Sequence, residues 1–200
     1  GASGPVQGDV LLAVGLKQPT VQASGTVTFS DTELALAAPA MQLSRLQGQL
    51  RFDNEHIRAD NLSLSWRGLP LTAALQGENS AQGYQLALQL NGAHQAQQLT
   101  QALHQPLTEL VNGDTDWQLT LALSLPQSGF TYRAELATDL QQTALALPAP
   151  YGKAAADKGK LSVSAYGNEQ RSLLALHYND ELHFHAELAH EQQRLNRAHL

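Results

Sequence analysis

The feature that most constrains the fold of this chain is a period of two in its hydrophobic residues. Trp117, Leu119 and Leu121 alternate with small or polar residues, and the same alternation recurs along most of the chain. Because successive side chains of a β-strand point to opposite faces, the pattern predicts strands that are apolar on one face only. Similar runs occupy residues 21–29, 46–52, 62–66, 69–75, 84–90, 130–136, 161–165, 174–178 and 182–184.

The breaks between these runs are mostly short and contain turn-forming residues, such as Ser30-Asp31, Gly167-Asn168 and Asn179-Asp180. A parallel return needs a long crossover, so short breaks predict antiparallel neighbours. The chain is therefore expected to be all-β, with about a dozen strands arranged mostly in hairpins.

One segment departs from this pattern. In residues 93–111, Leu99, Leu103, Leu107 and Leu110 recur at helical spacing. We expect one short helical insertion there, divided by Pro106 and covering part of the sheet.

The length of 200 residues suits one domain. Residues 5–189 are expected to form a single elongated antiparallel β domain that contains the 93–111 insertion. Gly1–Gly4 have the composition of a cloning remnant, and residues 190–200 are expected to be a truncated or poorly ordered tail. The chain is thus interpreted as a piece of a longer protein.

Composition excludes several functional classes. A net charge of -6 without a cluster of Lys and Arg argues against nucleic acid. The absence of Cys excludes disulfides, zinc-thiolate sites and thiol catalysis. The sequence also lacks a phosphate-binding loop, a nucleophile elbow and an H-E-x-x-H motif. We therefore expect neither an enzyme nor a cofactor.

Three histidines form the one candidate metal cluster. If Asn179 to Glu181 make a hairpin turn, Tyr178 pairs with Leu182, and His177 then lies opposite His183 on the polar face, with His185 two residues further along. Three imidazoles on one face are potential ligands for a divalent metal. The simpler interpretation, which we favour, is that all three are solvated.

The apolar face itself has two interpretations. An antiparallel sheet usually packs its apolar face on a second sheet, as in a sandwich or barrel. Alternatively, the sheet curls around a foreign apolar ligand. Periodicity alone does not separate the two.

Several phrases of the sequence resemble the AsmA-like periplasmic proteins of the YhdP type. One is Leu46 to Phe52, with the pattern Leu-x-Gly-x-Leu-x-Phe. Another is Gly113 to Trp117, a Gly-x-x-x-Trp strand that follows a short helical linker. The most specific is Leu145 to Lys153, which is similar to the family's Leu-x-Leu-Pro-x-Pro-x-Gly-Lys loop, with Tyr151 where a Leu is expected.

The resemblance implies a long, curled, groove-forming antiparallel sheet that carries phospholipid between the inner and outer membranes of Gram-negative bacteria. It also implies a periplasmic location, with the rest of the polypeptide as a partner and an inner-membrane anchor that is absent from this chain. The runner-up is a closed β-sandwich that acts as an interaction module of the cell envelope without a lipid role. Groove residues are expected to contact phospholipid acyl chains, although each residue is equally compatible with an ordinary core. The candidates are Leu62, Leu64, Trp66, Leu71, Leu86, Leu88, Trp117, Leu119, Leu121 and Leu123.

Overall fold

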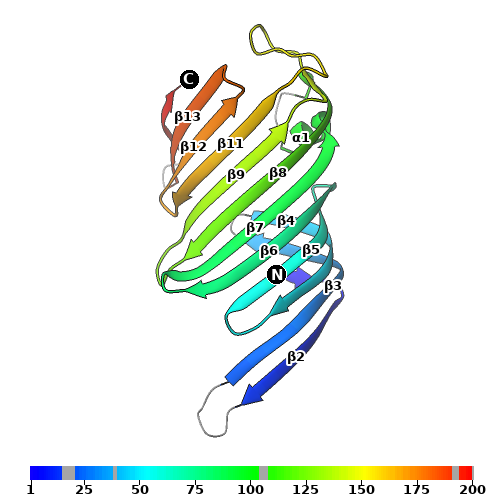
Figure 1. Cartoon of the computed structure of the whole chain (residues 1–200), viewed down its shortest axis with the longest axis vertical. Helices are drawn as coiled ribbons and strands as arrows, with labels where there is room; N and C mark the ends of the chain where they lie inside the picture. The colour runs from blue at the N-terminus through cyan, green and yellow to red at the C-terminus, as the bar shows by residue number, and fades with distance from the viewer. Residues whose placement is uncertain (15–20, 38–39, 104–107, 191–193, 200) are drawn as a thin grey trace. The chain divides into compact units, whose positions relative to one another are not determined.

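The computed structural model describes residues 1–14, 21–37, 40–103, 108–190 and 194–199. Strands dominate these residues, and the helix among them is short (Figure 1). In chain order the elements are β1 (Ala2–Ser3), β2 (Val6–Val14), β3 (Val21–Ala37), β4 (Ala40–Phe52), β5 (His56–Trp66), β6 (Leu69–Ser80), β7 (Gly83–Gln95), α1 (Ala96–Ala102), β8 (Val111–Leu125), β9 (Thr131–Asp139), β10 (Thr143–Leu145), β11 (Lys160–Asn168), β12 (Arg171–Tyr178), β13 (Leu182–Ala189) and β14 (Arg194–His199).

The described strands form one 14-stranded sheet in the order β1-β3-β4-β5-β6-β7-β8-β9-β11-β12-β13-β14, with β2 paired to β3 and β10 paired to β8. Most spatial neighbours are also neighbours in sequence, as short hairpin connections require. The strand order has two ends and does not close on itself. The prediction of an all-β chain with a long, curled antiparallel sheet is confirmed, and that sheet is open. A closed sandwich needs two facing sheets, so that alternative does not describe the fold.

The helix is shorter than the predicted insertion. It spans Ala96–Ala102, whereas the three preceding residues continue strand β7. His94 is buried between exposed neighbours, so the period of two persists to the end of that strand. The predicted division at Pro106 lies outside the described residues.

Both ends of the chain take part in the sheet. Ala2 pairs with Leu34 of β3, within the segment interpreted as a cloning remnant. At the other end, β14 pairs with β13, within the segment expected to be a tail. The described residues at both ends therefore have regular backbone partners.

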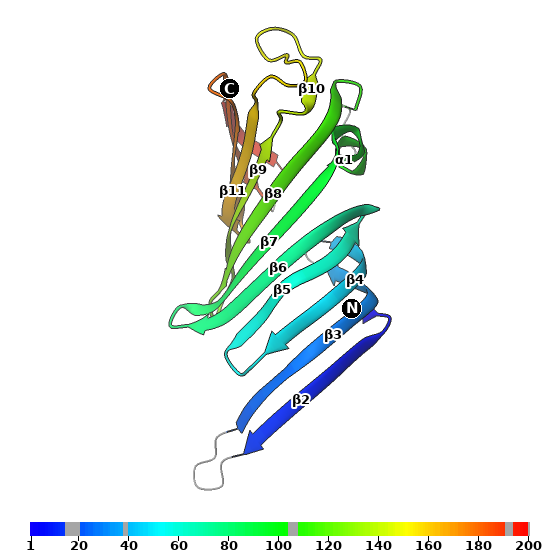
Figure 2. The same cartoon turned by 45° about the vertical axis from the view of Figure 1, so that its right-hand side comes forward.

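Two compact units divide the chain: unit 1 comprises Gly1–Leu90 and unit 2 comprises Asn91–Leu200. In unit 2, strands β8, β9, β11, β12 and β13 lie side by side (Figure 1), and Figure 2 shows β8, β9 and β11 from another side. Their registers run from β8 to β13 without a shift. Unit 2 therefore contains a regular block of five antiparallel strands.

The long strands of unit 1 are less regular. The β3–β4, β4–β5 and β5–β6 pairings all contain register shifts. Asp31 and Arg45 have positive φ values of 61° and 54° beside two of these shifts. Because an extra residue in one strand bends that strand and increases its twist, the strands of unit 1 bend at these shifts. The pairings from β8 to β13 contain none, although the β13–β14 pairing is shifted between Glu187 and Leu188.

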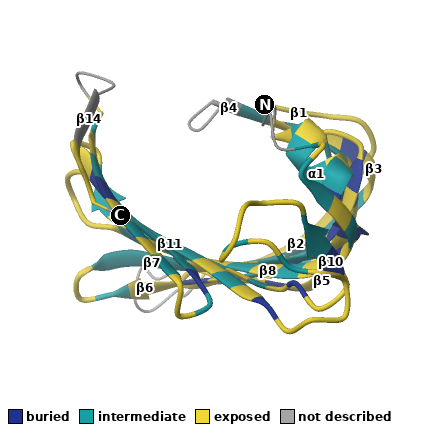
Figure 3. Ribbon diagram, turned by 90° about the horizontal axis from the view of Figure 1, so that it is seen from above, coloured by how far each residue is buried: buried dark blue, intermediate teal, exposed yellow. Residues whose placement is uncertain are grey.

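The most deeply buried apolar side chains lie mainly beside these irregularities. Among the residues that the structure describes, unit 1 accounts for seven of the eleven buried hydrophobic ones. Thr32 is fully buried there, and its hydroxyl donates a hydrogen bond to the carbonyl of Pro5 over 2.7 Å. Figure 3 shows how the buried residues are interspersed along the ribbon, which is mostly half-buried or exposed. The seven are Leu46, Ala59, Leu62, Leu64, Leu69, Leu71 and Ala73.

Candidate apolar binding surface

The regular strands of unit 2 align their apolar residues into rows that cross the sheet. Leu119 lies opposite Leu136, which in turn lies opposite Val163. The same row continues through Leu176 and Phe184. We call the surface built from these rows the apolar face of unit 2. Its other rows are Trp117, Thr138, Leu161, Tyr178 and Leu182; Leu121, Ala134, Ala165, Leu174 and Ala186; and Leu123, Tyr132, Gly167, Ser172 and Leu188.

Most of this face is only half-buried. Leu119, Leu121 and Leu123 are each intermediate in exposure, whereas their neighbours Gln118, Thr120 and Ala122 are exposed. Leu188, in the outermost row, is 37 % exposed. A fully covered sheet face would bury most of its leucines. This face therefore leaves apolar area in contact with water.

The opposite face of the same strands is polar. Arg133 and Glu135, which alternate with the apolar residues of β9, form an ion pair over 2.7 Å with both side chains largely exposed. Such an exposed pair adds little stability, but it identifies the solvated face. The sheet of unit 2 thus has one wet face and one apolar face.

A polar and aromatic cluster borders the apolar face between the end of β7 and the first half of β8. The indole Nε1 of Trp117 donates a hydrogen bond to Nδ1 of His94 over 3.1 Å, and the two rings are stacked with centroids 6.0 Å apart. His94 is 7 % exposed. Both rings cover Gly92, where a Cβ atom would come within 2.8 Å of either ring. The glycine therefore makes room for the tryptophan, and His94 fixes the orientation of the indole.

The other border of the face carries a hydrogen-bond chain. Tyr132 on β9 reaches Ser172 on β12 across Gly167, which has no side chain to block it. The hydroxyl of Ser172 is 2.7 Å from Nε2 of His190, whose Nδ1 is 3.0 Å from the carbonyl of Glu169. If Nδ1–H donates to that carbonyl, Nε2 accepts from the serine. These hydrogen bonds tie β9 and β12 to the residues that follow β11 and β13, at the edge of the apolar rows.

The candidates in unit 1 divide into two groups. Leu62, Leu64 and Leu71 are buried, with exposed fractions of 8 %, 7 % and 6 %. They lie on adjacent strands, since Leu64 pairs with Leu71, and they contribute to the core beside the bulges. Trp66 is half-buried, and the guanidinium of Arg67 lies 5.1 Å from its ring centroid.

Leu86 and Leu88 on β7 are half-buried as well. In this respect they resemble the four candidates on β8. The half-buried candidates are Trp66, Leu86, Leu88, Trp117, Leu119, Leu121 and Leu123.

The sequence-based candidate list omitted most of the apolar face of unit 2. Leu136, Val163, Leu176 and Phe184 share one row with Leu119. Each belongs to a period-two run of the sequence, so the signal was present. To align these runs across strands, one must also know the register of each hairpin. Turn geometry fixes that register, and hydrophobicity alone does not.

The proline-containing loop from Leu145 to Lys153 is organised around its lysine. Nζ of Lys153 donates to the carbonyl oxygens of Leu140, Thr143 and Ala154 over 2.7, 2.5 and 3.0 Å. A cation that bonds three carbonyl groups stabilises the loop from inside. Leu147, within this loop, is 36 % exposed.

The histidine hairpin has the predicted register. Tyr178 pairs with Leu182 and His177 pairs with His183, with His185 on the same face. Nδ1 of His177 lies 2.8 Å from Nδ1 of His183. Within the part of the chain that the structure describes, no three or more His, Asp or Glu side chains are grouped to hold a metal ion.

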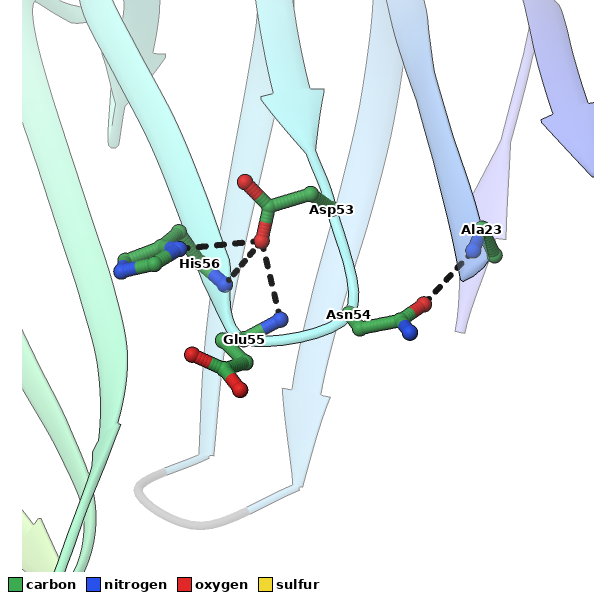
Figure 4. A network of polar contacts seen from close by, with 5 residues as sticks. All are labelled: Ala23, Asp53, Asn54, Glu55 and His56. Atoms are coloured by element: carbon green, nitrogen blue, oxygen red, sulfur yellow. Dashed lines mark hydrogen bonds and ion pairs between the residues drawn. The ribbon is translucent and has the colours of Figure 1, made fainter. Parts of the chain in front are cut away.

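The polar turn between β4 and β5 in unit 1 binds the first residues of β3 (Figure 4). The side-chain amide of Asn54 bonds the backbone of Ala23 and Val21, over 2.6 and 2.8 Å, and so extends the backbone pairing of β3. Hydrogen bonds from the backbone of Glu55 and from His56 lower the pKa of Asp53. The hydrogen bond to Asp53 raises the pKa of His56.

Fold and surface together define the class of protein: a single open antiparallel sheet that presents an apolar face and, among its described residues, leaves no buried side-chain N or O atom without a hydrogen-bond partner. This chain belongs to the YhdP family, whose model, described as "YhdP protein", matches residues 1–200. The resemblance to AsmA-like proteins of the YhdP type is thereby confirmed.

One curated relative is the "Intermembrane phospholipid transporter YhdP" of Escherichia coli (strain K12), which is 30 % identical over 166 residues. Those residues make up 82 % of this chain but 13 % of the relative, so the chain spans only a small part of that protein's length. No solved structure matches the chain. Among the described helices, none has the length and hydrophobicity to span a bilayer.

Proposed function

We propose that this chain is a non-enzymatic segment of a lipid transporter, and that its half-buried apolar surface contacts phospholipid acyl chains as they pass between the inner and outer membranes. The observation that carries the proposal is the apolar face of unit 2, which is continuous over five strands yet only half-buried. The name of the E. coli relative supports the same role. A periplasmic location follows from the proposal, because the path joins two membranes across that compartment.

The physical reason lies in the hydrophobic effect. Each methylene of an acyl chain exposed to water costs about 0.8 kcal/mol, so a chain of about 16 carbons costs on the order of 10 kcal/mol. A surface that replaces water along the path removes most of that barrier. It needs no catalytic group, which suits a face built from Leu, Val, Ala and Phe.

The proposed lining excludes the buried members of the original set. Leu62, Leu64 and Leu71 are assigned to the core of unit 1, because side chains this deeply buried have little area left for a lipid. The half-buried candidates, together with Leu136, Val163, Leu176 and Phe184, are assigned to the lipid-contacting surface.

We also propose that another part of the longer polypeptide pairs with β2. Every residue of that strand is exposed, including Val10 at 62 % and Leu12 at 65 %. An edge strand with exposed apolar residues invites further pairing. The chain also matches only a small fraction of its E. coli relative.

Neighbouring residues on opposite faces provide the test. A photo-crosslinking phenylalanine analogue is placed at Leu121 or at Thr120 in the full-length transporter, and bound lipid is detected by mass spectrometry. We expect phospholipid adducts at Leu121 and background levels at Thr120. In parallel, Leu121→Glu should block phospholipid transport, whereas Thr120→Glu should preserve it with the same expression level.

Two results would contradict the proposal. Equal adduct yields at the two positions would mean that the apolar face is not the lipid-contacting face. A folded Leu121→Glu protein with normal transport would mean that lipids do not cross this row. If Leu121→Glu fails to fold, Leu121→Gln and the crosslinking arm still decide the question.

A further inference from the structure

The hairpin of β12 and β13 brings two imidazoles into direct contact on the polar face of unit 2. His177 and His183 are directly opposite in the strand register. Their Nδ1 atoms are 2.8 Å apart, and their ring planes meet at 87°. This face lies on the other side of the sheet from the apolar rows, so a site here is independent of lipid contact.

We propose that His177 and His183 together bind a divalent transition-metal ion, with Cu²⁺ preferred over Zn²⁺. Imidazole nitrogen is a good ligand for copper, nickel and zinc, and the affinity of nitrogen ligands for divalent ions is highest at copper. Two ligands from adjacent strands of a regular sheet are held in place by the backbone before the metal arrives. That arrangement lowers the entropic cost of binding.

The distance between the ring nitrogens selects the geometry. With metal–nitrogen bonds of about 2.0–2.1 Å, nitrogens 2.8 Å apart subtend about 85° at the metal. That angle is close to the 90° between adjacent ligands of a square-planar or octahedral ion, and well below the tetrahedral angle that Zn²⁺ favours in structural sites. The spacing of the two nitrogens therefore suits Cu²⁺ or Ni²⁺ once both rings turn from each other toward the metal, whereas Zn²⁺ also requires the nitrogens to move apart.

The protons of the pair can be accounted for. A hydrogen bond between two Nδ1 atoms requires one of them to carry a proton, while the other accepts. When the metal binds both Nδ1 atoms, the donor ring moves its proton to its exposed Nε2 through water. Each imidazole remains neutral with one proton, so the neutral pair releases no net proton.

The third histidine is excluded from the pair. The His185 ring meets that of His177 edge-on, with centroids 5.6 Å apart. Because no group of three potential ligands occurs among the described residues, water would fill the remaining coordination positions. The site thus consists of two protein ligands, with His185 as a neighbour.

Titration of the full chain with Cu²⁺ tests the proposal. Isothermal titration calorimetry should show one tight site, and electron paramagnetic resonance should show hyperfine coupling of the copper to two imidazole nitrogens. His177→Gln and His183→Gln should each weaken binding by about tenfold or more. His185→Gln and the distant His56→Gln are matched controls and should stay within about threefold of the parent. Zn²⁺ should bind at least about tenfold more weakly than Cu²⁺.

Three outcomes would overturn it. Copper affinity that survives both pair substitutions would place the site elsewhere. An equal loss in His185→Gln would indicate a diffuse histidine patch, and equal affinity for Zn²⁺ would contradict the angular argument. Far-UV circular dichroism of each variant verifies folding, and His177→Asn replaces any variant that fails this check.

Discussion

Substituting alanine for Gly92 should expose how the border of the apolar face is built. A methyl group at this position would lie 2.5 Å from Cε1 of His94 and 2.7 Å from Cζ2 of Trp117. Both atoms belong to rigid rings that are hydrogen-bonded to each other, so neither ring can move away without breaking the Trp117–His94 hydrogen bond. The steric conflict therefore falls on the sheet itself.

The expected cost follows from these contacts. Overpacking a well-filled site costs about 1–3 kcal/mol, and alanine recovers about 0.5–1 kcal/mol relative to glycine within a strand. The net loss in the free energy of unfolding should be about 1–2 kcal/mol. Gly8→Ala is the control, since its new methyl group would approach nothing closer than the carbonyl of Thr26 at 3.7 Å. That variant should be neutral or slightly more stable.

Urea unfolding followed by circular dichroism measures the stability, and hydrogen exchange in β7 and β8 locates the loss. The double variant with Trp117→Leu should recover part of the stability, because the smaller side chain vacates the space above Gly92. A coupling energy of about 1 kcal/mol between the two sites is expected. If Gly92→Ala behaves like Gly8→Ala, or if the two substitutions are strictly additive, the rings of His94 and Trp117 do not restrict the space at position 92.

Two further predictions concern polar contacts. The Asp53–His56 turn should be best ordered between pH 3.8 and pH 6.5, the ordinary pKa values of the two groups. The contribution of His56 to stability is complete below pH 6.5 and is lost as the pH rises through its raised pKa. The contribution of Asp53 is complete above pH 3.8 and is lost as the pH falls through its lowered pKa. An NMR titration of His56 should show its raised midpoint return toward 6.5 in Asp53→Asn, and an unchanged midpoint would contradict this cause. Lys153→Met should cost about 2–4 kcal/mol of local stability, because three carbonyls lose a charged donor. Limited proteolysis should then cut residues 146–158 faster than in the exposed-lysine control Lys158→Met, and equal rates would show that Lys153 does not hold the loop.

Local pattern was sufficient to predict the fold class and the hairpin of the histidines. Alternation defines which residues share a strand face, and a short turn then fixes which residues face each other. Tyr178 and Leu182 pair as predicted because the apolar sets of both strands align only in that register. Here sequence and tertiary structure require the same arrangement.

The helix and the bulges depend on contacts that are distant in sequence. Strand β7 continues through His94 because that ring is bonded to Trp117, 23 residues further along. The left-handed backbone at Asp31 and Arg45 accompanies register shifts between whole strands. The sequence does show a break at Ser30-Asp31, but the break lies inside β3 and is a bulge, not the turn between strands that the sequence predicts. Arg45 carries no local signal of this kind.

The separation of core from surface rests on those bulges. Leu64 and Leu121 occur in nearly identical alternating runs, yet the first is buried and the second is half-exposed. Hydrophobicity therefore cannot distinguish a core leucine from a lipid-contacting one in this chain. Register shifts bend the strands of unit 1 around its leucines, whereas the unshifted registers of β8 to β13 keep their face open. It follows that inserting one residue into β9 beside Leu136 should change the exposure of Leu121 without changing any apolar residue.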